Sequence, residues 1–133
     1  MSHRVAHVGE IPAVAAPVEG LTWHPVRHTL DIQSFGTNAY TAAAAGDLLV
    51  EPHDEDEFEE LYVVLAGAAR FTVDGETFDA SAGALVLVTP PSHRVAHATE
   101  PGAAILAVGA VPGRAFAVSG WEERWLGRAA GQQ

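Results

Sequence analysis

The strongest structural signal in the chain is residues 69–79, which read ARFTVDGETFD. Polar and apolar residues alternate on both sides of Asp74 and Gly75, as they do in strands that bury one face. Asp and Gly both tolerate the positive φ angles that a two-residue hairpin turn requires. The segment therefore predicts a β-hairpin with Asp74 and Gly75 at its turn.

Apolar and β-branched segments flank this hairpin at intervals of about 8 to 12 residues, a spacing typical of all-β sandwiches and barrels. Upstream, strands are expected at residues 34–44 and 60–65. Downstream, they are expected at residues 84–88, 93–98 and 103–108. We therefore predict an all-β protein with a single barrel.

The remaining sequence divides around this β-rich region. Residues 1–20 are rich in Ala, Pro and Val without a regular period, so we expect an arm that is disordered or lies along another surface. Residues 21–118 contain no obvious linker and form the predicted barrel. Residues 119–133 carry Trp121 and Trp125 at helical spacing, which predicts a tail with a short amphipathic helix that packs on the barrel.

Composition excludes several classes of function. The 133 residues include 17 acidic and 7 basic ones, for a formal charge of -10 at pH 7, so we expect binding neither to nucleic acid nor to an anionic membrane. The absence of cysteine excludes disulfides, thiolate nucleophiles and zinc–thiolate sites. Residues 11–18 are apolar but contain two prolines between flanking glutamates, which does not fit a secretion signal, and we expect a cytoplasmic protein.

Residues that can bind a metal or move a proton concentrate in two segments. The first is residues 53–60, HDEDEFEE, most of whose carboxylates fit a solvated acidic loop. Glu60 differs, because strand alternation places it on one face with Tyr62 and Val64 and points it into the protein. A buried carboxylate requires a cation or hydrogen-bond donors, which a metal or an imidazole can supply.

The second segment contains His93 and His97, which share one face of the strand expected after the stiff Pro90-Pro91 pair. Two surface histidines on an edge strand are the alternative interpretation. If a barrel brings both segments to one end, His53, Glu60 and His93 form a plausible mononuclear metal site.

One feature of the sequence has no evident physical explanation. Residues 2–7 and residues 92–97 share the hexapeptide SHRVAH, although the sequences around the two copies differ completely.

Both ligand-rich segments resemble the sequence motifs of the cupin family. Residues 46–67 resemble the first motif, in which a Gly precedes His-x-His, a Glu and a second Gly. Residues 83–97 resemble the second motif, which has a Gly, a Pro-Gly turn, a His and then an Asn. The resemblance covers residues 21–118 and implies a small single-domain cupin of the RmlC-like type, an antiparallel jelly-roll barrel that is usually a homodimer.

Carried over position by position, the resemblance makes His53, Glu60 and His93 metal ligands, and it places Glu55 where the motif has its middle histidine. The implied set of two histidines and two carboxylates offers harder donor atoms than a three-histidine site does. Among Mn, Fe, Ni and Zn, this set shifts the preference toward Mn(II), Fe(II) or Ni(II). We expect no organic cofactor, since the sequence contains neither a phosphate loop nor a dinucleotide fingerprint.

Departures from the motifs leave open whether a metal is bound. The spacing before His53 differs by one residue, the Pro-Gly turn has become Pro-Pro at residues 90–91 with one residue fewer, and His97 stands in place of the Asn. Without metal, His53, Glu60 and His93 can still perform acid–base catalysis, because a carboxylate beside an imidazole separates their pKa values.

Three functions are compatible with this sequence. The first is an enzyme that acts on a small organic metabolite in the barrel, through a metal or through Glu60 or His93 as the base of an isomerisation, dehydration or cyclisation. The second is a binding or sensing module without turnover, which the fold alone does not separate from an enzyme. The third is a structural dimer with a residual motif. We also predict a homodimer, with residues 1–20 or the alanine-rich strand at its interface.

Overall fold

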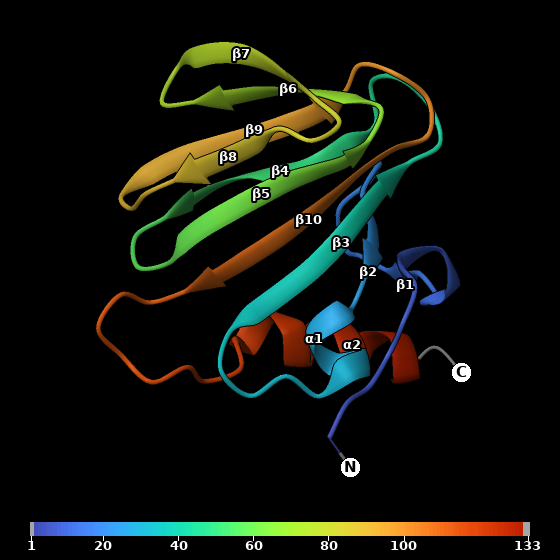
Figure 1. Ribbon diagram of the computed structural model, residues 1–133, viewed down its shortest axis with the longest axis vertical. Coiled ribbons are helices and arrows are strands. Elements are labelled where there is room, and N and C mark those ends of the chain that lie inside the picture. Colours follow the sequence, from blue (N-terminus) through green and yellow to red (C-terminus); the bar gives the residue numbers. More distant parts are fainter. Residues whose placement is uncertain (1, 132–133) are drawn as a thin grey trace.

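Two antiparallel β-sheets pack against each other in the computed structural model, which describes residues 2–131 (Figure 1). The larger sheet contains, in spatial order, β1 (Val14–Ala15), β2 (Thr22–His24), β3 (Gly36–Ala42), β10 (Ala103–Ala110), β5 (Glu59–Ala66) and β8 (Leu85–Val88). The smaller sheet contains β4 (Leu48–Glu55), β9 (Ser92–Ala98), β6 (Ala68–Val73) and β7 (Glu76–Ser81). This arrangement is the all-β jelly-roll barrel that the sequence predicted.

The hairpin expected over residues 69–79 is present as β6 and β7. Asp74 and Gly75 form its turn with φ angles of 49° and 81°. Phe71 pairs with Phe78 across the two strands, and their rings stack with centroids 5.7 Å apart. Turn chemistry and period-2 alternation therefore specify this part of the fold locally.

The core lies between the two sheets. Tyr62 and Val64 of β5 point into it with Phe71 and Ile105, and none of these side chains is more than 2% exposed. On the opposite face of β5, Leu65 is 44% exposed. The alternation predicted for β5 is therefore confirmed.

Three short helical segments accompany the sheets: η1 (Val8–Glu10), α1 (Val26–Leu30) and α2 (Gly120–Gly131). Helix α2 confirms the predicted C-terminal helix, whereas α1 was not expected and begins directly after Pro25. Val26 of α1 and Ile11 pack on Ala39 of β3, so part of the N-terminal arm lies along the surface of its own chain. None of the described helices is long and apolar enough to cross a bilayer.

Aromatic packing and a buried ion pair fix α2 in place. The ring of Trp23 is completely buried, and its centroid lies 5.4 Å from that of Trp121 and 5.4 Å from that of Trp125. Nε of Arg27 lies 2.9 Å from a carboxylate oxygen of Glu122, and both side chains are buried. These contacts join β2, α1 and α2 beside the opening of the barrel.

Candidate functional site

One end of the barrel holds a cavity of about 220 Å³. Strands β3, β4, β5 and β10 form its walls, and residues 116–122 cover one side of it. Its described lining includes no arginine side chain but five carboxylates, those of Glu51, Glu55, Glu57, Glu60 and Glu122.

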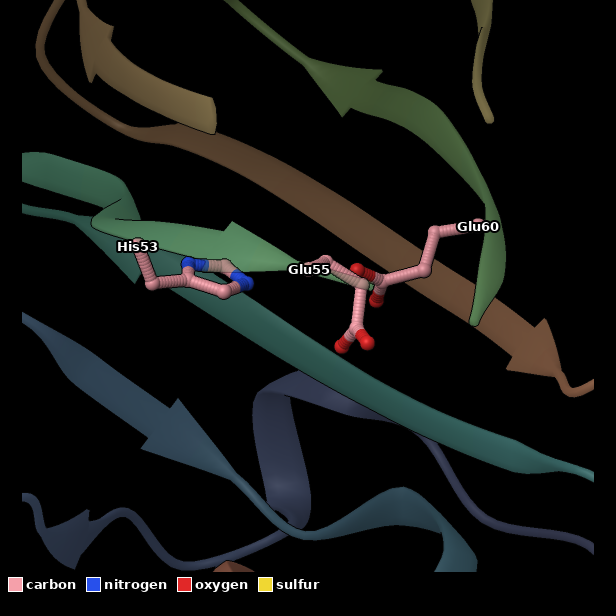
Figure 2. Close-up of side chains that lie close together, drawn as sticks. All are labelled: His53, Glu55 and Glu60. Carbon is pink, nitrogen blue, oxygen red and sulfur yellow. The ribbon is translucent and has the colours of Figure 1, made fainter. Parts of the chain in front are cut away.

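Three ligand-capable side chains converge at this cavity. Figure 2 shows the imidazole of His53 and the carboxylates of Glu55 and Glu60 pointing toward one another. One ligand atom from each lies within 4.8 Å of the other two. His53 and Glu55 share a face of β4, and Glu60 enters from β5 across the hairpin. The structure thus brings together three of the four residues proposed from the sequence as metal ligands.

His53 is held in one orientation by the backbone. Its Nδ1 lies 2.7 Å from the carbonyl oxygen of Glu51. Because a carbonyl only accepts hydrogen bonds, Nδ1 carries the proton and donates it. The Nε2 lone pair then remains free to bind a metal or accept a proton, which is the arrangement seen for metal-binding histidines.

The two carboxylates are held differently. Oε2 of Glu55 accepts hydrogen bonds from the backbone N–H groups of Glu57 and Phe58 at 3.1 and 3.2 Å. Oε1 of Glu60 accepts from the hydroxyl of Tyr62 and from Nη1 of Arg94, each at 3.0 Å. Both carboxylates are therefore fixed by hydrogen bonds before any ligand binds.

Burial dominates the electrostatics of Glu60. It raises the pKa of this carboxyl above its ordinary value, although the Tyr62 hydrogen bond and the charges of Arg94 and His53 oppose that rise. Desolvation likewise raises the pKa of Glu51, and the charge of His53 opposes it. Both carboxyl groups therefore retain protons at higher pH than exposed glutamates do.

His93, the fourth proposed ligand, is not part of this group. Its half-exposed side chain lies on the outer face of β9, where Nδ1 contacts Oδ1 of Asp54 at 2.9 Å. His97 is also exposed on that face. The inward position belongs to Arg94, whose side chain is completely buried. The expectation that His93 meets His53 and Glu60 is therefore corrected.

The register of β9 explains the outward position of His93. Side chains alternate along the strand, so Ser92, Arg94 and Ala96 are buried whereas His93 and His97 are exposed. The sequence signal that could have identified Arg94 is the one-residue departure from the motif before His93, because a one-residue shift exchanges the two faces of a strand.

Comparison with known proteins places this barrel in a family. A family model described as "Cupin domain" matches residues 40–109, a span that includes His53, Glu55, Glu60 and Arg94. The match covers more than half of the chain. The protein is a member of the cupin domain family. No curated protein matches its sequence.

Solved structures support the same fold for this cupin. A cupin protein from Bacteroides fragilis aligns with a TM-score of 0.66 and 18% identity, covering 90% of this chain and 92% of that one. A predicted oxalate decarboxylase from Thermotoga maritima aligns with a TM-score of 0.66 and 16% identity, covering 81% and 99%. A sugar phosphate isomerase of the cupin superfamily from Silicibacter pomeroyi aligns with a TM-score of 0.66 and 17% identity, covering 80% and 74%. The three superpositions show that these chains share the fold of this protein.

The donor set of this cupin fits one hard divalent cation. Imidazole nitrogen together with carboxylate oxygen suits Mn(II), Fe(II) and related ions. When Glu55 and Glu60 are ionised, Arg94 balances one of their two negative charges, and the other remains for a bound cation to compensate. Arg94 itself cannot bind a metal, because a guanidinium has no acceptor. The fitting ligands are therefore one histidine and two glutamates.

Sequence reasoning missed several groups that line the cavity. The sequence pattern indicates no role for Glu51 and only a packing role for Trp121, yet both line the cavity. Both contacts depend on the tertiary fold, and the local sequence carries no signal for them. Tyr40 lines the cavity as well, where burial and the charges of nearby carboxylates raise its pKa, so that it remains a neutral phenol.

Proposed function

We propose that this cupin binds one divalent metal ion through His53, Glu55 and Glu60 and acts on a small organic molecule held in the adjoining cavity. The observation that carries this proposal is the convergence of the three ligand atoms, within 4.8 Å of one another, on a cavity of about 220 Å³. A metal bound there would supply Lewis-acid chemistry. The oxygen-rich ligand set favours Mn(II) or Fe(II) over zinc and copper, whose sites tend to use softer ligands.

The chain's own residues contribute orientation and proton transfer. Tyr62 and Arg94 hold one oxygen of Glu60, so its other oxygen can face a ligand in a fixed position. Burial shifts the pKa of Glu60 toward neutral pH, where a carboxyl group is most effective as a general acid or base. This observation favours a second candidate function, metal-free proton transfer by Glu60 in an isomerisation, dehydration or cyclisation.

Charge argues against the substrates named for the two enzyme neighbours. Oxalate and sugar phosphates are anions, and the names of those neighbours associate them with such substrates. The cavity of this cupin is lined by five carboxylates, and no arginine is among its described lining residues. We therefore propose a neutral or cationic substrate, or a ligand of that kind that is bound without turnover.

Metal binding is tested by comparing His53→Ala and Glu60→Gln with the control His93→Ala. We expect calorimetric titration with Mn²⁺ to show near-stoichiometric binding to the wild-type protein, prepared without a histidine tag. Each of the first two variants should lose more than about 100-fold in affinity, since even changes outside the ligand shell cost about 10–100-fold. His93→Ala should retain wild-type affinity because His93 lies on the outer face. A failure of Mn, Fe, Ni and Zn to bind would contradict the metal site.

The same variants separate an enzyme from a binding protein. Once a ligand has been found, loss of turnover in folded Glu60→Gln would support the enzyme. A change in ligand affinity alone would support the binding module. If His53→Ala and Glu60→Gln alter the melting temperature but neither turnover nor ligand affinity, the motif is a structural remnant.

We also propose a homodimer, formed through the outer face of β5 and β8. Leu85 and Leu87 of β8 are 68% and 60% exposed, and they pair with Val63 and Leu61 of β5. Strand β8 ends the six-stranded sheet, and apolar edge strands tend to associate. This surface is an alternative to residues 1–20 and the alanine-rich strand, where Ile11 and Ala39 are already buried within the chain.

A further inference from the structure

One carboxylate in the cavity has no assigned partner. The other four are each held by an arginine or by backbone N–H groups. The side chain of Glu51 forms neither an ion pair nor a hydrogen bond within the described residues. Glu51 also lies outside the group whose ligand atoms come within 4.8 Å of one another. Its carboxylate therefore remains available to a ligand in the cavity.

A buried donor faces the same cavity. Asn38 is 7% exposed and lines the cavity from β3. Its Oδ1 accepts a hydrogen bond from Nε1 of Trp23 at 2.7 Å. Because the indole N–H only donates, the amide of Asn38 is fixed with its oxygen toward Trp23. Its Nδ2 donates no hydrogen bond to any described residue, so this NH₂ group is available to a ligand.

Aromatic walls join these two groups. Tyr40 lies two residues after Asn38 on the same face of β3, and it lines the same cavity as Glu51. Trp121 lines the cavity from α2. An anionic carboxylate beside aromatic rings attracts an organic cation, through the ion pair and through the negative faces of the rings.

We propose that Glu51 and Tyr40 bind the ammonium group of a small organic amine, and that Asn38 donates a hydrogen bond to a neutral oxygen of the same molecule. The ligand class is thus a small amino alcohol or amino amide. This inference rests on the proposed function in that it names the ligand of the same cavity. The cavity volume of about 220 Å³ is below the range of about 300–1,000 Å³ usual for ligand pockets, which favours a small ligand.

Three probes that differ only at one end test this proposal. They are 4-aminobutan-1-ol, which is cationic, butane-1,4-diol, which is neutral, and 4-hydroxybutanoate, which is anionic. Calorimetric titration of the full chain should show that the amine binds at least about tenfold more tightly than the diol, and that the anion binds most weakly. Equal binding of amine and diol, tighter binding of the anion, or no binding of the amine would overturn the proposal.

The variant Glu51→Gln examines the residue itself. It should lower the affinity for 4-aminobutan-1-ol at least about tenfold and leave the diol unaffected. Glu57→Gln is the matched control, because Glu57 also lines the cavity but has Arg114 at 3.4 Å as its partner. Unchanged amine affinity in folded Glu51→Gln would overturn the assignment. If Glu51→Gln does not fold, the ranking of the three probes by their affinity for the wild-type protein still tests the proposal.

Metal binding is measured separately on the same samples. Titrating the amine into chelator-treated protein and into Mn²⁺-loaded protein keeps the two proposals apart. Amine binding without metal binding would support this inference and contradict the metal site. Metal binding without a preference for the amine would support the metal site and contradict this inference.

Discussion

Nη1 of Arg94 lies 3.0 Å from Oε1 of Glu60, and the arginine side chain is completely buried. Its Nη2 donates to Oγ of Ser92 at 2.6 Å, whereas its Nε has no hydrogen-bond partner in the described part of the chain. The pair thus places a permanent positive charge inside the barrel, directly behind a proposed metal ligand.

Removing Arg94 should destabilise the protein. Arg94→Met leaves Glu60 without its cation, and breaking a buried pair in this way costs about 3–5 kcal/mol. Urea denaturation should show that loss in the free energy of unfolding. The double variant Glu60→Gln/Arg94→Met should recover part of it, because no buried charge then lacks a partner. A single variant as stable as the wild type would contradict a structural role for the pair.

The raised pKa of Glu60 predicts a specific pH dependence of stability in the metal-free protein. The folded state holds this proton more tightly than the unfolded state does, so the free energy of unfolding falls as pH rises from 4.5, the ordinary value, through the raised pKa. Glu51 contributes a slope of the same sign. Denaturation at successive pH values should show a shallower slope for Glu60→Gln. An identical slope in both proteins would rule out this contribution.

Gly109 leaves the space that Glu60 occupies. A Cβ at this position would lie 2.9 Å from the carbonyl oxygen of Glu59 and 3.0 Å from Cγ of Glu60. Gly109→Ala should therefore displace Glu60, weaken Mn²⁺ binding and cost about 1–3 kcal/mol of stability. Gly127→Ala is the control, since nothing lies within 4 Å of a Cβ there, and it should stabilise α2 by up to about 1 kcal/mol. Wild-type metal affinity in Gly109→Ala would refute the role of Gly109.

The exposed leucines of β8 predict the oligomeric state. Leu85→Glu and Leu87→Glu place charges in the proposed interface, which should convert a dimer into a monomer without loss of fold. Light scattering measures the mass, and circular dichroism checks the fold. Phe78→Glu is a suitable control, because Phe78 is 37% exposed on the other sheet and should leave the mass unchanged. A wild-type monomer would show that this face is not a self-association surface.

Local patterns in the sequence were sufficient to predict much of the fold. The turn at Asp74 and the alternation around Glu60 depend only on near neighbours, and both predictions are confirmed. The solvated loop expected within the acidic segment is also present, since residues 56–58 connect β4 to β5 and Asp54, Asp56, Glu57 and Glu59 are exposed. Glu55 is the exception, because it ends β4 and lines the polar cavity.

Features that depend on distant contacts could not be predicted in this way. The hexapeptide SHRVAH forms part of β9 at residues 92–97, yet it is exposed and without regular structure at residues 2–7. Neighbouring strands, absent around the first copy, determine the structure of the second. The cavity role of Glu51 depends in the same way on α2, which is distant in the sequence and contributes Trp121 and Glu122 to the lining.

All three tryptophans of the chain meet at one contact, where α2 packs beside the cavity. The intrinsic fluorescence of this protein therefore originates from a single place, and Trp121 itself lines the cavity wall. A ligand that enters the cavity, or an event that lifts α2 away from β2, should change the emission without any introduced label. The intrinsic tryptophan fluorescence of the native chain can therefore be used to screen for ligands.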